Sequence, residues 1–166
     1  RLVLPDGEAH KTSEHWLQII DKLVKIRATR DTTLVTLGGG VIGDLGGFAA
    51  ASYMRGINFI QVPTSLLAQV DASVGGKTGF NHPKGKNLIG AFHQPGAVLI
   101  DIETLKTLPA REFSAGLAEV AKIAAVRDEA FLNWLENNDA AIMSREPEAI
   151  TSMIRRSVAN KADVVA

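Results

Sequence analysis

The chain has 166 residues, 46% of them hydrophobic, which is enough for one domain or for one domain with part of a second. Lys plus Arg and Asp plus Glu both number 18, so charge gives no reason to expect a nucleic acid or an anionic membrane as a partner. The absence of cysteine excludes disulfides and thiolate metal sites and favours the cytoplasm, and no apolar run approaches the roughly 18 residues that span a bilayer.

The first 25 residues predict a short strand followed by an amphipathic helix. The strand covers Leu2–Leu4 and ends at the turn sequence Pro5–Gly7. Glu8 and Lys11 follow, and by themselves they are most simply a solvated pair beside the turn. Thr12 or Ser13 can then cap a helix. Its apolar residues recur with the helical period and predict one stripe that packs on a sheet: Trp16, Ile19, Ile20, Leu23 and Val24.

Three glycines separate an apolar run, Thr32–Leu37, from a run of small residues that favours a helix. Gly38, Gly40 and Gly43 have G-x-G-x-x-G spacing. The unpaired N–H groups and positive dipole end of such a helix suit a phosphate, although the glycines can also serve packing alone. No Asp or Glu follows after about 20 residues, which argues against a standard dinucleotide fold.

Two further strands and a long polar segment complete the first part of the chain. Asn58–Val62 reads as a buried strand closed by Pro63, and the helix between it and Thr32–Leu37 predicts a parallel βαβ unit. Between Leu66 and Gln94 lysines stand among glycines, either to hold an anion or as ordinary surface residues. Apolar residues spaced through this segment predict that it is ordered. Ala97–Asp101 is the third strand.

From Pro109 onward the patterns are only helical, with predicted helices over Glu112–Val126, Glu129–Glu136 and from Pro147. We therefore expect an α/β domain over residues 1–109 and the beginning of an all-α domain over residues 110–166. The chain starts without methionine and stops inside a helical pattern, so we expect it to be a fragment of a longer protein. Glu119 lies among apolar helix neighbours and is either an exposed residue or a ligand with a tuned pKa.

Taken together, these segments closely resemble the 3-dehydroquinate synthase family of sugar phosphate cyclases. The resemblance covers nearly the whole chain and rests on motifs in the right order and spacing: Leu4-Pro-Asp-Gly-Glu8 with Lys11; Gly38-Gly-Gly-Val-Ile-Gly-Asp44 with Gly47-Phe-Ala-Ala-Ala-Ser-Tyr-Met-Arg55; Gln61-Val-Pro-Thr64 through Asp71-Ala-Ser-Val-Gly-Gly-Lys77; Gly85-Lys-Asn-Leu-Ile-Gly-Ala-Phe92; and Gly116-Leu-Ala-Glu-Val-Ala-Lys122.

The resemblance implies a Rossmann-like NAD-binding α/β domain with a parallel sheet, followed by the start of an all-α metal-binding domain. It implies a cytoplasmic lyase of the shikimate pathway of aromatic amino acid biosynthesis. Such an enzyme converts 3-deoxy-D-arabino-heptulosonate 7-phosphate to 3-dehydroquinate and phosphate, with NAD recycled in each turnover and zinc or cobalt bound. The family is typically homodimeric. We expect the fragment alone to be inactive.

Carried over residue by residue, the resemblance also implies a set of site residues. Glu119 is a metal ligand, and the other two ligands are expected beyond Ala166. Asp71, Lys77 and Lys122 surround the reacting hydroxyls as catalytic residues, while Arg55 and Asn87, with Lys77, hold the substrate phosphate. The NAD contacts are Asp6, Gly7, Glu8, Lys11, Gly40, Val41, Ile42, Gly43, Asp44, Thr64, Ser65, Lys77, Lys86, Thr104, Leu105, Lys106 and Thr107.

Three other hypotheses remain open at this stage. One is a cyclase of the same fold that acts on glucose 6-phosphate or sedoheptulose 7-phosphate. Another is a metal-dependent glycerol or alcohol dehydrogenase, which shares a Gly-Gly-Gly loop and releases NADH. The last is that the chain is only a nucleotide-binding piece or an inactive remnant.

Overall fold

The computed structural model describes residues 1–165 and divides the chain into two compact units. Leu66, expected in the sheet domain, is fully buried among the helices, so its segment belongs with them. The division by packing therefore differs from the change of sequence pattern at Pro109. The α/β unit comprises Arg1–Pro63 and Gly76–Leu99, and the helical unit comprises Thr64–Gly75 and the chain from Ile100 onward.

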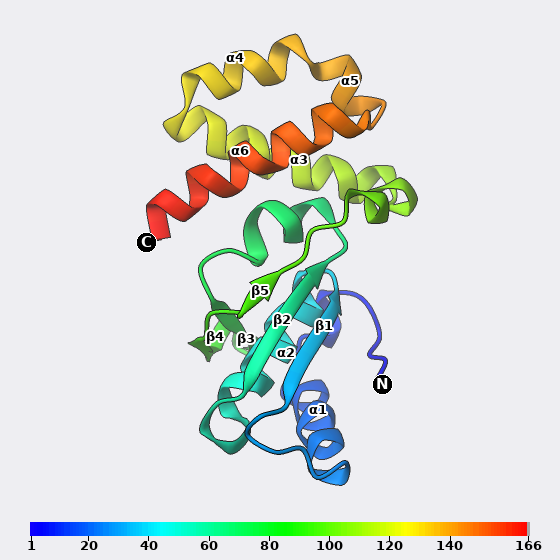
Figure 1. The fold of residues 1–166 in the computed structure, drawn as a ribbon, viewed down its shortest axis with the longest axis vertical. Coiled ribbons are helices and arrows are strands. Elements are labelled where there is room, and N and C mark those ends of the chain that lie inside the picture. The colour runs from blue at the N-terminus through cyan, green and yellow to red at the C-terminus, as the bar shows by residue number, and fades with distance from the viewer. Residues whose placement is uncertain (166) are drawn as a thin grey trace. The chain divides into compact units, whose positions relative to one another are not determined.

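A parallel three-stranded sheet forms the centre of the α/β unit, in the order β1-β2-β5 (Figure 1). β1 (Thr33–Gly38) and β2 (Asn58–Pro63) begin and end within one residue of the predicted strands, and the predicted parallel sheet is confirmed. β5 (Ala97–Val98) is shorter than the predicted strand to Asp101. Its end is set by packing, because Ile100 already belongs to the helical unit.

The N-terminal segment differs from the prediction in two places. The strand predicted over Leu2–Leu4 is wrong, because this segment pairs with no strand within residues 1–165; Leu4 packs instead against the hydrophobic core. A single 3-10 turn, η1 (Glu8–His10), leads to helix α1 (Ser13–Lys25), which Thr12 caps as predicted. Val24 is 59% exposed, since it lies about 80° round the helix from Trp16, at the edge of the apolar stripe.

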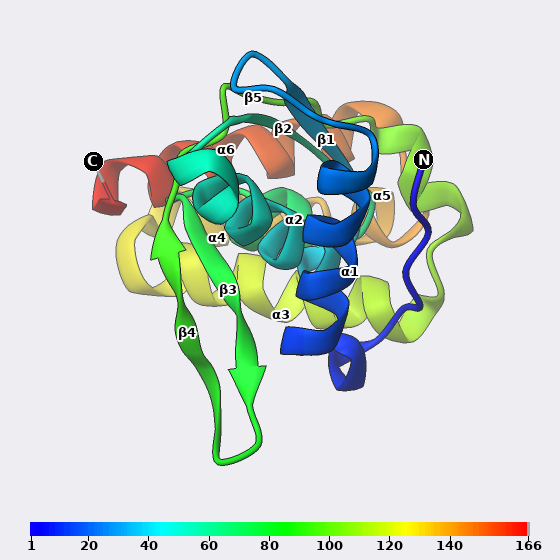
Figure 2. The same ribbon diagram turned by 90° about the horizontal axis from the view of Figure 1, so that it is seen from below.

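An antiparallel hairpin of β3 (Lys77–His82) and β4 (Gly85–Phe92) occupies the segment in which the sequence predicts order but no strands (Figure 2). Its glycines and lysines obscure the alternation of apolar residues that identifies a strand. The hairpin contributes Phe80 to the core, where its ring lies 5.9 Å from that of Trp16.

Helix α2 (Gly40–Ser52) follows β1 and packs against both the sheet and the hairpin. Two glycines make this close approach possible. A Cβ on Gly46 would lie 2.2 Å from Thr36 Cγ2 of β1, and a Cβ on Gly47 would lie 2.5 Å from Thr78 Cγ2 of β3. The small residues of this run therefore set the position of the glycine-loop helix. α2 ends in the 3-10 turn η2 (Tyr53–Arg55).

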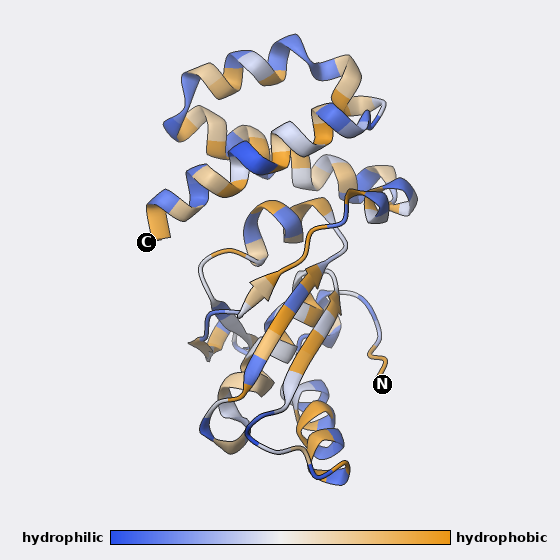
Figure 3. Ribbon diagram, in the orientation of Figure 1, coloured by the Kyte–Doolittle hydropathy of each residue, from blue (hydrophilic) through white to orange (hydrophobic). Residues whose placement is uncertain are grey.

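The helical unit packs its amphipathic helices around one core that includes Leu105, Phe131, Ile150 and Met153. Figure 3 shows polar and apolar residues alternating along these helices. The predicted helices are present, and the structure adds the short helix α5, which the sequence analysis did not predict. The elements are η3 (Ala68–Ala72, a π-helical turn), η4 (Ile102–Thr107, a 3-10 helix), α3 (Ala110–Arg127), α4 (Glu129–Asn137), α5 (Asp139–Met143) and α6 (Pro147–Val165). None of the helices described is both long and apolar enough to cross a membrane.

Asp128 joins the start of α4 to α6. Its Oδ1 accepts a hydrogen bond from Phe131 N (2.8 Å), and its Oδ2 accepts one from Asn160 Nδ2 (3.0 Å). The Asn160 hydrogen bond, followed by the Phe131 amide, lowers the pKa of Asp128 below its ordinary value of 3.8. A lowered folded pKa means that Asp128 stabilises the fold above about pH 4, and that this contribution disappears as the pH falls through the folded pKa.

Asp128→Asn is therefore expected to lower the melting temperature at pH 7 and to reduce the loss of melting temperature between pH 7 and pH 3. Circular dichroism melts at both pH values measure this. Asp163→Asn, at an exposed position of α6, is the matched control and should leave both values unchanged. An equal loss of melting temperature between pH 7 and pH 3 in Asp128→Asn and in the parent protein would contradict the stabilising role of the Asp128 carboxylate.

Candidate functional site

The glycine loop lies between the carboxyl end of β1 and the first turn of α2. Gly39 is the N-cap, and the first helical hydrogen bonds run from the N–H groups of Ile42 and Gly43 to Gly39 O. The N–H groups of Gly40 and Val41 precede these bonds, at the positive end of the helix dipole. A Cβ on Gly43 would lie 2.8 Å from Gln61 Nε2, so this glycine brings the helix against β2. The loop can thus offer backbone donors to an anion.

Lys11 is 5% exposed and links the glycine-loop helix to the hairpin. Its ammonium forms an ion pair with Asp44 in α2 and donates a hydrogen bond to Asn87 Oδ1 in β4 (2.6 Å). The family resemblance implies that Lys11 and Asp44 contact the cofactor and that Asn87 contacts the phosphate. The structure brings all three together. The interpretation of Lys11 as one member of a solvated pair with Glu8 is wrong, because Lys11 is buried and pairs with Asp44.

Asn81 extends this network to Glu8. Its Nδ2 donates to Glu8 Oε1 (2.7 Å), and its Oδ1 accepts from the backbone N–H of Asn87 (2.8 Å). Sequence reasoning missed Asn81 because the hairpin that brings it to Glu8 was not predicted. A chain of polar contacts therefore runs from Glu8 through Asn81, Asn87 and Lys11 to Asp44.

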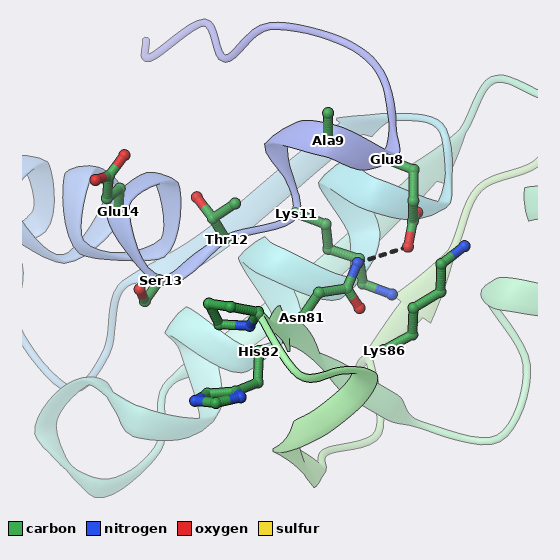
Figure 4. Close-up of a pocket in the computed structure, with 10 residues that line it drawn as sticks. Glu8, Ala9, Lys11, Thr12, Ser13, Glu14, Asn81, His82 and Lys86 are labelled. Carbon is green, nitrogen blue, oxygen red and sulfur yellow. Dashed lines mark hydrogen bonds between the residues drawn. The ribbon is translucent and has the colours of Figure 1, made fainter.

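An open pocket of about 510 Å³ lies beside this network (Figure 4). Lys86 of β4 lines it together with Glu8 and Lys11, so three of the predicted NAD contacts share one wall. Gly7, just before η1, has φ 98°, a conformation that glycine adopts readily. Asp6 beside it is exposed. The pocket is also lined by Ala9, Thr12, Ser13, Glu14, Asn81, His82 and Pro83.

In the helical unit, four charged residues form a second cluster. Asp71, on η3, forms an ion pair with Lys161 of α6 (Nζ to Oδ1, 2.5 Å), and Lys161 also donates to the backbone oxygen of Asp71. Glu119 of α3 forms an ion pair with Lys122 (2.5 Å). Lys161 could not be identified from the sequence, because no motif marks it and its partner is 90 residues away.

Glu119 is only 18% exposed, whereas Lys122 is 62% exposed. The Glu119 hydrogen bond, with smaller contributions from the charges of Glu119 and Asp71, raises the pKa of Lys122 above 10.5. Lys122 is therefore an ammonium at neutral pH and can act as a hydrogen-bond donor, not as a base. Of the two alternatives that the sequence leaves open for Glu119, an exposed residue is wrong: the carboxylate is largely buried and has a cationic partner.

The other predicted NAD contacts of the helical unit lie on two short helical segments. Ser65 Oγ accepts from the N–H of Ala68 and caps the segment that carries Asp71. Thr104, on η4, donates through its hydroxyl to Asp101 O (2.7 Å) and accepts from Gln69 Nε2 (3.2 Å). Thr64, Leu105, Lys106 and Thr107 complete this group.

Arg145 secures η4 from the loop before α6. Its guanidinium donates to the backbone oxygens of Leu105 and Leu108 and lies 4.5 Å from the ring centroid of Phe113. Leu105 O also accepts from the backbone N–H of Leu108, so the guanidinium is its second donor. The cation thus fixes the position of the Thr104–Thr107 segment.

Lys77 and Arg55 stand apart from both networks. Lys77 is the first residue of β3, opposite Phe92, and Arg55 is the last residue of η2, with φ 67°. Both are exposed, and neither side chain makes a hydrogen bond or ion pair within residues 1–165. Within the same residues, no group of three or more His, Cys, Asp or Glu side chains could hold a metal ion.

Comparison with known proteins places these features in one family. The family model described as 3-dehydroquinate synthase N-terminal matches residues 1–115, and the one described as 3-dehydroquinate synthase C-terminal matches residues 116–166. The chain is 62% identical to the 3-dehydroquinate synthase of Pseudomonas putida (strain W619) over 164 residues, and 60% identical to that of Methylococcus capsulatus (strain Bath). It covers 45% and 46% of these two relatives, while they cover 99% of the chain.

Two solved sugar phosphate cyclases have similar structures. The 2-epi-5-epi-valiolone synthase of Streptomyces hygroscopicus subsp. jinggangensis 5008, with NAD+ and Zn2+ bound, gives a TM-score of 0.92 at 32% identity, over 96% of this chain and 45% of that one. A 2-deoxy-scyllo-inosose synthase with carbaglucose-6-phosphate, NAD+ and Co2+ gives 0.82 at 27% identity, over 99% and 45%.

Solved dehydrogenases resemble this chain in fold only. Glycerol dehydrogenase of Schizosaccharomyces pombe gives a TM-score of 0.67 at 16% identity, over 92% of this chain and 44% of that one. Such low identity says nothing about activity. The assignment rests on two findings. The N-terminal and C-terminal models of one family together match the whole chain, and the chain is 62% identical to a member of that family. The chain belongs to the 3-dehydroquinate synthase family.

Proposed function

We propose that the full-length protein catalyses the 3-dehydroquinate synthase reaction, from 3-deoxy-D-arabino-heptulosonate 7-phosphate to 3-dehydroquinate and phosphate. The observation that carries this proposal is the 62% identity to 3-dehydroquinate synthases over nearly the whole chain, against 32% to a valiolone synthase of the same fold. The chain spans about half the length of these relatives, so the activity is proposed for the complete protein.

The two sequence regions have separate roles in this proposal. Residues 1–109 form the NAD-binding α/β domain, and residues 110–166 begin the all-α domain that holds metal and substrate. The segment 64–75, which carries Thr64, Ser65 and Asp71, packs with the helices.

The glycine loop is suited to the pyrophosphate of NAD. The amides of Gly40 and Val41 are available for an anion, and Gly43 and Asp44 follow them in α2. The pocket wall of Glu8, Lys11 and Lys86 provides both charged and hydrogen-bonding groups for the cofactor. Further proposed contacts are Asp6, Gly7, Ile42, Thr64, Ser65, Lys77, Thr104, Leu105, Lys106 and Thr107.

Glu119 suits a divalent metal because it is a half-buried carboxylate, a ligand type that zinc accepts. We propose it as one of three ligands for zinc or cobalt. When bound, NAD takes up and returns a hydride at one ring carbon, which acidifies the neighbouring C–H, while the metal polarises the hydroxyl being oxidised. Lys122 beside Glu119 stays protonated and donates to the substrate.

The remaining roles follow from charge. Asp71 is held by Lys161 and is suited to accept a hydrogen bond from a reacting hydroxyl, with Lys77 and Lys122 as donors. Arg55, Lys77 and Asn87 are proposed to hold the phosphate that leaves. Their positive charge and amide donors match a phosphate dianion.

We also propose that the full-length protein is a cytoplasmic homodimer with no nucleic-acid or membrane partner, in which Arg55 reaches the neighbouring subunit's site. The equal numbers of acidic and basic residues and the exposure of Arg55 support this proposal. Sedimentation of the full-length protein measures its oligomeric state, and a monomer at micromolar concentration would contradict the proposed dimer.

The reaction is tested by phosphate release from the full-length protein with NAD and zinc or cobalt. Turnover of the heptulosonate phosphate should exceed that of glucose 6-phosphate and sedoheptulose 7-phosphate by about a hundredfold or more, because a site that pairs the substrate's polar groups rejects analogues which leave them unpaired. NADH should not accumulate. Preference for either other sugar phosphate would identify a different cyclase, and sustained NADH formation a dehydrogenase. NAD binding without any turnover would leave only the nucleotide-binding role.

A further inference from the structure

The Lys11 ammonium donates a hydrogen bond to the side chain of Asn87, which lies 76 residues further along the chain. We propose that Lys11 is a positioning residue which orients the Asn87 amide so that its NH₂ group faces the phosphate of the substrate. This inference rests on the proposed function of Asn87 and assigns Lys11 a task other than direct contact with NAD.

The chemistry of the two groups fixes the orientation of the amide. A lysine ammonium has three donors and no acceptor, so it can face only the oxygen of an amide. Asn87 Oδ1 lies 2.6 Å from Lys11 Nζ, and Asn87 Nδ2 therefore points away from the lysine. Nδ2 has no hydrogen-bond partner within residues 1–165. A phosphate accepts hydrogen bonds only, and this orientation presents it with donors.

The backbone of Asn87 is fixed by a second oriented amide. The carboxylate of Glu8 accepts from Asn81 Nδ2, which turns Asn81 Oδ1 toward the N–H of Asn87. That N–H bond holds Asn87 at φ 55°, a left-handed conformation that asparagine tolerates better than most residues. Glu8 therefore fixes the backbone of Asn87 through Asn81, and Lys11 fixes its side chain.

Lys11 itself has little freedom to move. It is buried, and its ion pair with Asp44 anchors it to the N-terminal half of α2. Because Asp44 offsets its charge, Lys11 contributes to anion binding by orientation more than by net charge. The same anchor ties the phosphate residue to the glycine loop.

The test is a double-mutant cycle for inorganic phosphate, measured by ³¹P NMR titration of the full-length protein with saturating NAD. Lys11→Met and Asn87→Ala should each weaken phosphate binding about tenfold, because each removes or misdirects a charge-assisted hydrogen bond. The double variant should bind phosphate within about twofold of Asn87→Ala alone, since Lys11 acts through Asn87. Lys84→Met, an exposed lysine between the hairpin strands, is the matched control for loss of charge and should change phosphate affinity by less than about twofold.

Two conservative variants cover the case in which Lys11→Met fails to fold. Lys11→Arg keeps a cation that can only donate and should retain phosphate affinity within about threefold. Asn87→Asp still pairs with Lys11 but replaces the NH₂ donors by an anionic oxygen, and should lose affinity at least as severely as Asn87→Ala. Circular dichroism spectra confirm that each variant is folded.

Three outcomes would overturn the proposal. They are the absence of phosphate binding by the parent protein, an unchanged phosphate affinity in Lys11→Met or Asn87→Asp, and losses of phosphate affinity in the two single variants that multiply in the double variant. The binding cycle needs no turnover. A parent protein that shows the coupled pattern but releases no phosphate from the heptulosonate phosphate would refute the proposed reaction and leave the role of Lys11 standing.

Discussion

Glu119→Gln is expected to remove the metal from the full-length protein and to lower phosphate release by at least about a hundredfold. Glutamine keeps the shape of the side chain but lacks the charge that binds a divalent cation. It also replaces the anionic acceptor of the Lys122 hydrogen bond by a neutral one, so the pKa of Lys122 should fall toward 10.5. Metal content by mass spectrometry of the purified protein and initial rates of phosphate release measure the two effects.

The matched control is Glu112→Gln, which makes the same change at an exposed position on the same helix. It should retain metal and activity within about twofold, because it removes only a solvated charge. NAD affinity should be unchanged in both variants, since neither Glu119 nor Glu112 is among the proposed NAD contacts. A Glu119→Gln protein with full metal content and activity would remove Glu119 from the proposed site.

Gly116→Val is expected to destabilise the helical unit by about 3 kcal/mol and to lower its melting temperature by several degrees. A Cβ on Gly116 would lie 2.7 Å from Leu66 Cβ and 2.9 Å from the backbone nitrogen of Leu67. The Leu67 backbone cannot move aside as a flexible side chain can. α3 would have to shift away from the segment that carries Asp71, which would also disturb the Asp71, Glu119 and Lys122 cluster.

Valine is the more decisive substitution at Gly116. Alanine would recover about 1 kcal/mol of helix propensity, which would mask part of the cost of the clash. Ala118→Val is the matched control, because it introduces the same side chain at an exposed position two residues further along α3. Its cost should be about 0.6 kcal/mol, from helix propensity alone. Equal melting temperatures for the two variants would show that Gly116 is not needed for close packing.

The local elements that carry the glycine loop could be predicted from the sequence. β1, β2 and α2 follow from short-range patterns: apolar β-branched runs, a glycine loop and a small-residue helix. The ranges of α3 and α4 also followed from the helical period. The candidate residues came from motifs whose order and spacing match one family, and both family models cover the chain.

Other features could not be predicted, because they depend on contacts between distant residues. The hairpin has a weak local pattern, and packing on α2 and Trp16 holds it in place. The strand expected at Leu2–Leu4 is absent, since an apolar run becomes a strand only when a partner pairs with it. Leu66 packs in the core of the helical unit, because whether a residue is buried depends on the neighbours that the fold places around it.

The sequence by itself determined the fold class, the glycine loop and the chemical types available to the site, because these depend on residues close together in the chain. Only the tertiary structure decided how those residues are used. It made Lys11 a buried bridge between Asp44 and Asn87, and it brought Lys161 to Asp71 across 90 residues. Hydrogen bonds and ion pairs act over a few ångströms, so only the fold can bring together partners that lie this far apart in sequence.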